Sequence, residues 1–164
     1  MKITASAEGF VGAPASRVYA YIADFRQHHS HFLPPEFSNL VVEQGGVGVG
    51  TVVRFTLRLG GRSSTATVHV DEPEPGRVLT ETEPTRRLVT KFTVDHGPRG
   101  TSRVRIETTW EASGMRALIE RSVLPRMLKR LYAEELRLLD AYARERSRRS
   151  PRILATMGRG VVVT

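Results

Sequence analysis

The chain opens with a pattern typical of a strand followed by short helices. Apolar and polar residues alternate loosely over residues 2–11, which predicts a first strand. A Gly-Ala-Pro segment at residues 12–14 ends this pattern, and proline is well tolerated in the first turn of a helix. Apolar residues then recur every three or four positions, which predicts a short helix over residues 14–25. A second short helical segment is expected to end at the paired prolines 34 and 35.

Residues 37–112 show the period of two that is typical of half-buried antiparallel strands. Gly60-Gly61 separates two alternating segments, residues 53–59 and 65–70, and predicts a tight hairpin between them. Further strands are predicted over residues 77–83, 88–94 and 104–110. About six strands therefore follow one another after the short helices, and the first strand brings the expected total to about seven.

The last predicted element is a long helix over residues 115–145 with one broad apolar face. This face consists of Leu124, Met127, Leu128, Leu131, Tyr132, Leu138, Leu139 and Tyr142. Pro125 lies within the segment and lacks the N–H that would bond to the carbonyl of Arg121. Either the helix bends at Pro125, or the helix proper begins near Leu124 and residues 114–123 form a separate turn. Both alternatives leave space beneath residues 115–118.

These elements predict an α+β fold of the helix-grip kind. A curved antiparallel sheet of about seven strands would wrap around the long C-terminal helix, with two short helices after the first strand. We expect residues 1–146 to form this one domain, because 164 residues with 40% apolar content suffice for a single core. Residues 147–164 are rich in arginine and are expected to form a flexible basic tail.

Charge and composition narrow the range of functions. The net charge is +8, but six arginines and one glutamate lie from Arg144 onward, so the rest of the chain carries only +3. A nucleic-acid partner is therefore not expected, because such a protein needs a basic stripe on its folded surface. The absence of cysteine excludes disulfides and a cysteine nucleophile. No membrane span or signal peptide is predicted, so we expect a cytoplasmic monomer or homodimer.

Glu135 is the exceptional residue of the long helix, because helical spacing places it near the middle of the apolar face. A carboxyl group that faces a core must find a partner or have a raised pKa. One interpretation is a polar group inside a ligand pocket that acts as a general acid or base. The other is a structural salt bridge to an arginine, or a side chain that reaches past the edge of the sheet to water.

We expect a mostly apolar cavity between the sheet and this helix, which suits a hydrophobic or aromatic ligand. Its predicted lining residues are Phe55, Leu57, Thr90, Phe92, Thr108, Trp110, Leu118, Arg121, Leu124, Leu128 and Leu131, with Glu135 as the candidate catalytic residue. The glycine-rich residues 45–50 lack a phosphate-loop ending and are expected to form a hairpin at the mouth of this pocket.

His28, His29 and His31 form the one cluster of possible metal ligands, between the two short predicted helices. We expect a solvated helix junction there and no metal, because adjacent residues of a helix point about 100° apart. No serine lies in a glycine-flanked nucleophile motif, so a covalent intermediate is not expected either. We predict that the protein uses no cofactor.

Four segments carry a resemblance to a known family: residues 11–24 (VGAPASRVYAYIAD), 32–34 (FLP), the glycine-rich residues 45–51 and the helix end at 138–142 (LLDAY). With the order of elements, they resemble the START-like (SRPBCC) superfamily and, within it, the bacterial polyketide cyclase/dehydratase group. The resemblance covers about residues 2–146. It implies the helix-grip fold but leaves function open, since members bind lipids, hormones and polyketides, perform chemistry or assist chaperones.

Three functions remain as hypotheses. The first is binding of a small hydrophobic or polycyclic molecule in the cavity. The second is a cofactor-free cyclase or dehydratase, in which Glu135 and a histidine or arginine transfer protons. The third is a protein-interaction module, such as a chaperone regulator or a toxin–antitoxin component. A cavity that contains a carboxyl group with a raised pKa favours the second, and an exposed apolar patch without a cavity favours the third.

Overall fold

Seven antiparallel strands form one curved sheet in the computed structural model, which describes residues 1–150 except for the side chains of Arg116 and Ile119. The strands are β1 (Lys2–Val11), β2 (Phe37–Gln44), β3 (Val52–Leu59), β4 (Arg62–Glu74), β5 (Val78–Glu83), β6 (Leu88–His96) and β7 (Ser102–Glu111). Their order in the sheet is β1-β7-β6-β5-β4-β3-β2, so β1 crosses over to pair with β7. The predicted fold class is confirmed.

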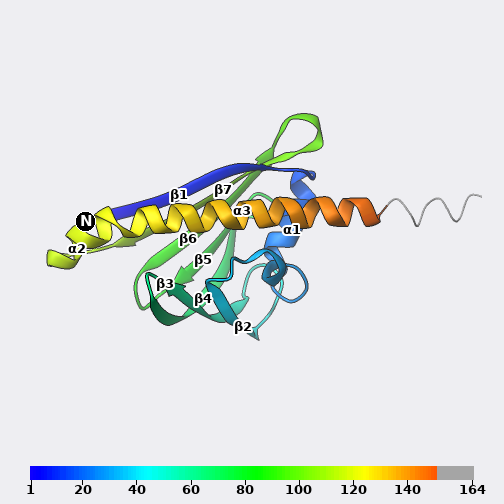
Figure 1. The fold of residues 1–164 in the computed structure, drawn as a ribbon. Helices are drawn as coiled ribbons and strands as arrows, with labels where there is room; N and C mark the ends of the chain where they lie inside the picture. Colours follow the sequence, from blue (N-terminus) through cyan, green and yellow to red (C-terminus); the bar gives the residue numbers. More distant parts are fainter. Residues whose placement is uncertain (151–164) are drawn as a thin grey trace, which may run out of the picture.

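The helices occupy the concave side and the ends of this sheet (Figure 1). They are α1 (Ala15–Ala23), the 3₁₀ turns η1 (His29–Phe32) and η2 (Pro98–Gly100), α2 (Gly114–Ser122) and α3 (Leu124–Arg149). The long helix α3 crosses the sheet, with α1 near its C-terminal part and α2 at the opposite end, beside the chain's N-terminus. The predicted pair of short helices corresponds to α1 and η1. No helix in the described part of the chain is long and apolar enough to cross a membrane.

The predicted helix over residues 115–145 is in fact two helices, with Val123 between them. Pro125 lies in the first turn of α3, where its missing N–H costs no hydrogen bond, so the second of the two alternatives is correct. At its other end α3 continues to Arg149, three residues into the predicted tail. The remainder of that tail, residues 151–164, lies outside the described residues.

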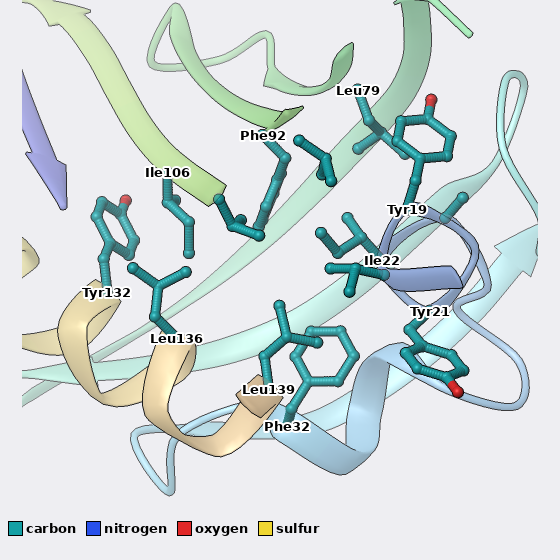
Figure 2. Packing of buried hydrophobic residues seen from close by; sticks show 14 of the residues in the cluster. Tyr19, Tyr21, Ile22, Phe32, Leu79, Phe92, Ile106, Tyr132, Leu136 and Leu139 are labelled. Atoms are coloured by element: carbon teal, nitrogen blue, oxygen red, sulfur yellow. The ribbon is translucent and has the colours of Figure 1, made fainter. Parts of the chain in front are cut away.

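One face of α3 packs into the core of the molecule. Tyr132, Leu136 and Leu139 point from α3 towards the sheet, where Figure 2 shows Ile106 and Phe92. Towards the C-terminal part of α3 the packing is tight, and the side chains of Phe32 and Leu139 are both at most 1% exposed. The carboxylate of Asp140 also accepts a hydrogen bond of 2.8 Å from the N–H of Gly12, which joins α3 to the loop after β1.

The glycine-rich residues 45–50 do not lie at the mouth of a pocket, contrary to the prediction. They pack against the end of α1, where the N–H of Phe25 donates to the carbonyl of Gly46 and the N–H of Gly48 donates to the carbonyl of Ala23. Gly45 and Gly48 both have φ of +65°, a conformation that favours glycine. This segment therefore supports α1 through backbone hydrogen bonds.

Leu139→Ala should be strongly destabilising, because Leu139 is 1% exposed and the truncation leaves a void in the tightly packed half of the core. We expect the free energy of unfolding to fall by about 2–5 kcal/mol in urea titrations. Leu138→Ala is the matched control, since Leu138 is only partly buried and should cost clearly less. Equal losses in the two variants would contradict the described orientation of α3.

Candidate functional site

A cavity of about 100 Å³ lies between the sheet and the N-terminal half of α3. It is several times larger than the roughly 10–15 Å³ that one water molecule requires. Its walls come from η1, from the strands β2 to β6 and from α3, and most of them are apolar. Seven of the predicted site residues line it, namely Phe55, Leu57, Thr90, Phe92, Leu128, Leu131 and Glu135.

Five of the predicted lining residues lie elsewhere: Thr108 and Trp110 on β7, and Leu118, Arg121 and Leu124 around the break between α2 and α3. Leu118 is 59% exposed on α2, Arg121 is exposed on the same helix, and Leu124 is half-buried at the start of α3. Trp110 is buried on β7, two residues beyond Thr108 and outside the cavity wall. Met115, at the start of α2, is 86% exposed and does not line this cavity.

A row of polar residues crosses the concave face next to the cavity. The sheet register pairs Glu81 of β5 with Thr90 of β6, and Thr90 with Thr108 of β7. The hydroxyl groups of Thr90 and Thr108 are 2.8 Å apart, and Thr108 also forms a hydrogen bond with the Tyr132 hydroxyl of α3. Thr108 therefore lies behind the cavity wall and connects it to α3, instead of lining the cavity itself.

Glu135 faces the cavity from α3 and is 2% exposed. Its Oε1 atom has no hydrogen-bond partner among the described residues, and no arginine there pairs with it. Burial, and then the charge of Glu81, raise the pKa of Glu135 well above its usual value. Of the interpretations offered above, the geometry matches a carboxyl group inside a pocket.

Glu81 is a second carboxyl group in the cavity, which the sequence reasoning missed. Its side chain is 13% exposed, and burial raises its pKa to about 7. A signal was available in β5, because residues two apart in a strand face the same side of the sheet. Glu81 follows two residues after Leu79, which is fully buried. With Glu83, three acidic residues thus line the cavity, and the charge of Glu81 acts on Glu135.

His29 also lines the cavity, and the expectation of a solvated junction is wrong for this residue. The turn η1 directs its ring inward, where it is 2% exposed and stacks on Phe25 at 4.3 Å between centroids. The Nδ1–H group donates to the carbonyl of Ile22 at 2.6 Å, which leaves Nε2 to face Oε1 of Glu81 at 3.9 Å. Burial lowers the pKa of His29 to about 4, so the ring is neutral at pH 7.

The other two histidines lie outside the cavity, at the C-terminal part of α3. Nδ1 of His28 is 2.6 Å from the hydroxyl of Tyr142, and the ring of His31 stacks on the ring of Tyr142. The three histidines therefore have separate roles in packing. Within residues 1–150 no three histidine or acidic side chains converge as metal ligands.

Comparison with known proteins identifies the family of this chain. Residues 2–144 match the family described as "Polyketide cyclase / dehydrase and lipid transport". The chain belongs to this family. The resemblance found in the sequence is thereby confirmed, and membership of the polyketide cyclase/dehydrase family supports a ligand-binding or cyclase role. None of the curated proteins compared with the chain matches it.

Solved structures of similar proteins share the fold of this cyclase/dehydrase family member. The KanY protein is 27% identical, with a TM-score of 0.77 over 88% of this chain and 99% of that one. The Zhui aromatase/cyclase from a Streptomyces species is 20% identical, with a TM-score of 0.71 over 90% and 96% of the two chains. A START superfamily protein from Mycobacterium smegmatis is 16% identical, with a TM-score of 0.60 over 87% and 95%.

Glu135→Leu should leave the free energy of unfolding unchanged or raise it by up to about 3 kcal/mol, because an unpartnered buried carboxyl group is replaced by apolar surface of similar size. The measurement is the unfolding midpoint in urea. Glu134→Leu is the matched control: the side chain of Glu134 is 41% exposed, pairs with Arg137 at 2.7 Å and should matter little. A clear loss of stability in Glu135→Leu alone would mean that Glu135 anchors the fold through a partner.

The difference in the free energy of unfolding between Glu135→Leu and the wild type should depend on pH. A carboxyl group whose pKa is raised in the folded state favours folding below its unfolded pKa and loses this contribution as pH rises through the folded pKa. The advantage of Glu135→Leu over the wild type should therefore be larger at pH 8 than at pH 5. For Glu81→Gln the stability advantage over the wild type should grow as pH rises from about 4.5 to about 7. An advantage that does not vary with pH in either variant would contradict the raised pKa values.

Proposed function

We propose that this protein binds a small hydrophobic or polycyclic molecule in the cavity between its sheet and α3. The carrying observation is the mostly apolar space itself, lined by aromatic rings such as Phe25, Phe55 and Phe92. Protein interiors are normally close-packed, and an unfilled void loses the dispersion contacts of its walls. A ligand of matching shape restores these contacts and removes its own apolar surface from water.

Small side chains keep this space open. Ser64 and Ala66 line the cavity from β4, and the register pairs Ala66 with the large Phe55 on β3. Larger residues at these positions would fill the space without changing the backbone. The size of the cavity therefore depends on a few side chains and is independent of the helix-grip frame around it.

A second candidate function is a cofactor-free cyclase or dehydratase. The observation that favours it is the pair of carboxyl groups, Glu81 and Glu135, in one apolar cavity with the neutral ring of His29. When two carboxyl groups repel each other, one ionises before the other. The ionised group can remove a proton from a carbon next to a carbonyl, while the protonated group gives its proton to a departing hydroxyl, which leaves as water.

Ala66→Phe should abolish ligand binding, because its ring would occupy the cavity. Native mass spectrometry of the purified wild type should reveal a bound small molecule that denaturation releases, and Nile red, a neutral apolar dye, should become fluorescent in the emptied protein. Both signals should be lost in Ala66→Phe. Thr65→Phe is the matched control, since Thr65 is exposed on the opposite face of β4 and should leave both signals intact.

Two results would count against ligand binding. One is wild-type protein that neither retains a small molecule nor takes up Nile red. The other is equal dye binding by Ala66→Phe and Thr65→Phe, which would place the dye outside the cavity. Thermal unfolding of each variant shows whether it remains folded.

The second function is tested by the mass of the released compound. A cyclase or dehydratase incubated with a linear poly-β-ketone should yield a product that has lost water. Glu135→Gln should retain the starting compound unchanged while Glu134→Gln turns it over like the wild type. Recovery of unchanged compound from wild-type protein would leave binding as the function.

A further inference from the structure

The polar groups that face the cavity are mostly hydrogen-bond acceptors. An ionised Glu81 or Glu135 only accepts, and His29 presents the bare Nε2 because its Nδ1–H group is committed to the carbonyl of Ile22. The hydroxyl of Tyr132 is already engaged with Thr108. Although Ser64, Thr90 and Arg86 also line the cavity, no donor among residues 1–150 is hydrogen-bonded to Nε2 of His29, to Glu81 or to Oε1 of Glu135, so a ligand can supply the donors.

Residues 1–150 also provide no paired cation for these two carboxyl groups. Neither Glu81 nor Glu135 forms an ion pair with a lysine or arginine among residues 1–150. Arg86 borders the cavity from the turn after β5, but it is exposed, and burial alone accounts for the raised pKa of Glu81. Glu83 is occupied as well, since its two carboxylate oxygens accept the N–H groups of Thr85 and Arg86.

Aromatic rings surround this acidic end of the cavity. Phe25 and Phe92 pack against His29, and Phe55 faces the same space from β3. The faces of aromatic rings attract organic cations, and the attraction is stronger where water is excluded. The combination of unpaired carboxyl groups and aromatic walls suits a positively charged group on an otherwise apolar molecule.

We propose that the cavity binds a hydrophobic molecule carrying a protonated amine, with its ammonium group held by Glu81, Glu135 and His29. A primary ammonium group has three N–H donors, which can serve Glu81 and the facing Nε2 of His29, 3.9 Å apart, and the unpartnered Oε1 of Glu135. Its charge compensates the carboxylates that the apolar surroundings otherwise disfavour. This inference rests on the proposed binding function and specifies the chemical class of the ligand.

Proton release should accompany binding. A carboxyl group that is protonated in the empty cavity ionises when the ammonium group arrives, so one proton passes to solvent and the occupied cavity carries the same net charge as the empty one. Because the pKa of Glu81 is about 7, affinity for the amine should rise as pH increases from about 6 to about 8. The ionisable groups around the amine are His29, Glu81, Glu83, Arg86, Tyr132 and Glu135.

The experiment compares three probes of one shape by isothermal titration calorimetry at pH 8: naphthalenemethylamine, naphthalenemethanol and naphthalenecarboxylate. Hydrogen bonds to charged groups contribute about 1.5–3 kcal/mol, so the amine should bind about 10–100-fold more tightly than the alcohol. The carboxylate should bind most weakly. Near pH 7, titrations in buffers of different protonation enthalpy should show proton release for the amine alone.

Glu81→Gln and Glu135→Gln should each remove most of the preference for the amine while leaving affinity for the alcohol nearly unchanged. Glu134→Gln is the matched control, because it removes a carboxyl group from the exposed side of α3 and should behave as the wild type. Circular dichroism establishes that each variant is folded. If one cavity variant fails to fold, the other still provides the test.

The outcomes separate this inference from the function on which it rests. Equal binding of amine and alcohol by the wild type would overturn the amine proposal and leave binding of a hydrophobic ligand intact. A preference for the amine that survives in both Glu81→Gln and Glu135→Gln would overturn it too. Failure of all three probes to bind would count against both proposals.

Discussion

Burial of one face of α3 against the concave side of the sheet is the interaction on which the rest of the structure depends. A helix presents neighbouring residues at intervals of three and four, so the residues that seal the core and those that face the cavity follow one another along a single stripe. Leu136 and Leu139 pack tightly, whereas Leu131 and Glu135 meet open space. The position of the acidic group is therefore fixed by the same contacts that hold the fold together.

The sheet adds a second constraint, the register between its strands. Because partners across strands are fixed, Glu81, Thr90 and Thr108 fall in one row, and the polar end of the cavity has a defined width and direction. Tyr132 closes this row from α3 through its hydrogen bond with Thr108. The cavity is acidic at this place because the helical repeat turns Glu135 inward and the strand repeat turns Glu81 inward at the same level of the fold.

The sequence was informative where structure is determined locally. Alternation predicted the strands, and helical spacing predicted that Glu135 faces inward, because both patterns depend only on neighbouring residues. Glu81 was missed although β5 carried the signal, and its proximity to Glu135 depends on strand register, which no local pattern contains. His29 was misjudged because its direction is set by how η1 packs on Phe25 and Ile22. The sequence did not decide whether residues 114–123 continue the long helix or form a separate segment, since Pro125 is compatible with both a bend and a helix start.

The division of α3 into a tightly packed half and a half above the cavity has a consequence for how a ligand enters. Phe32 and Leu139 are packed on all sides, whereas the first turns of α3 border the cavity through Leu128 and Leu131, and regions with fewer packing contacts open locally more readily than a packed core. Sub-global opening at that end costs less free energy than unfolding. Exchange of the cavity's contents can therefore proceed through a native-state fluctuation while the other half of the helix holds the domain together.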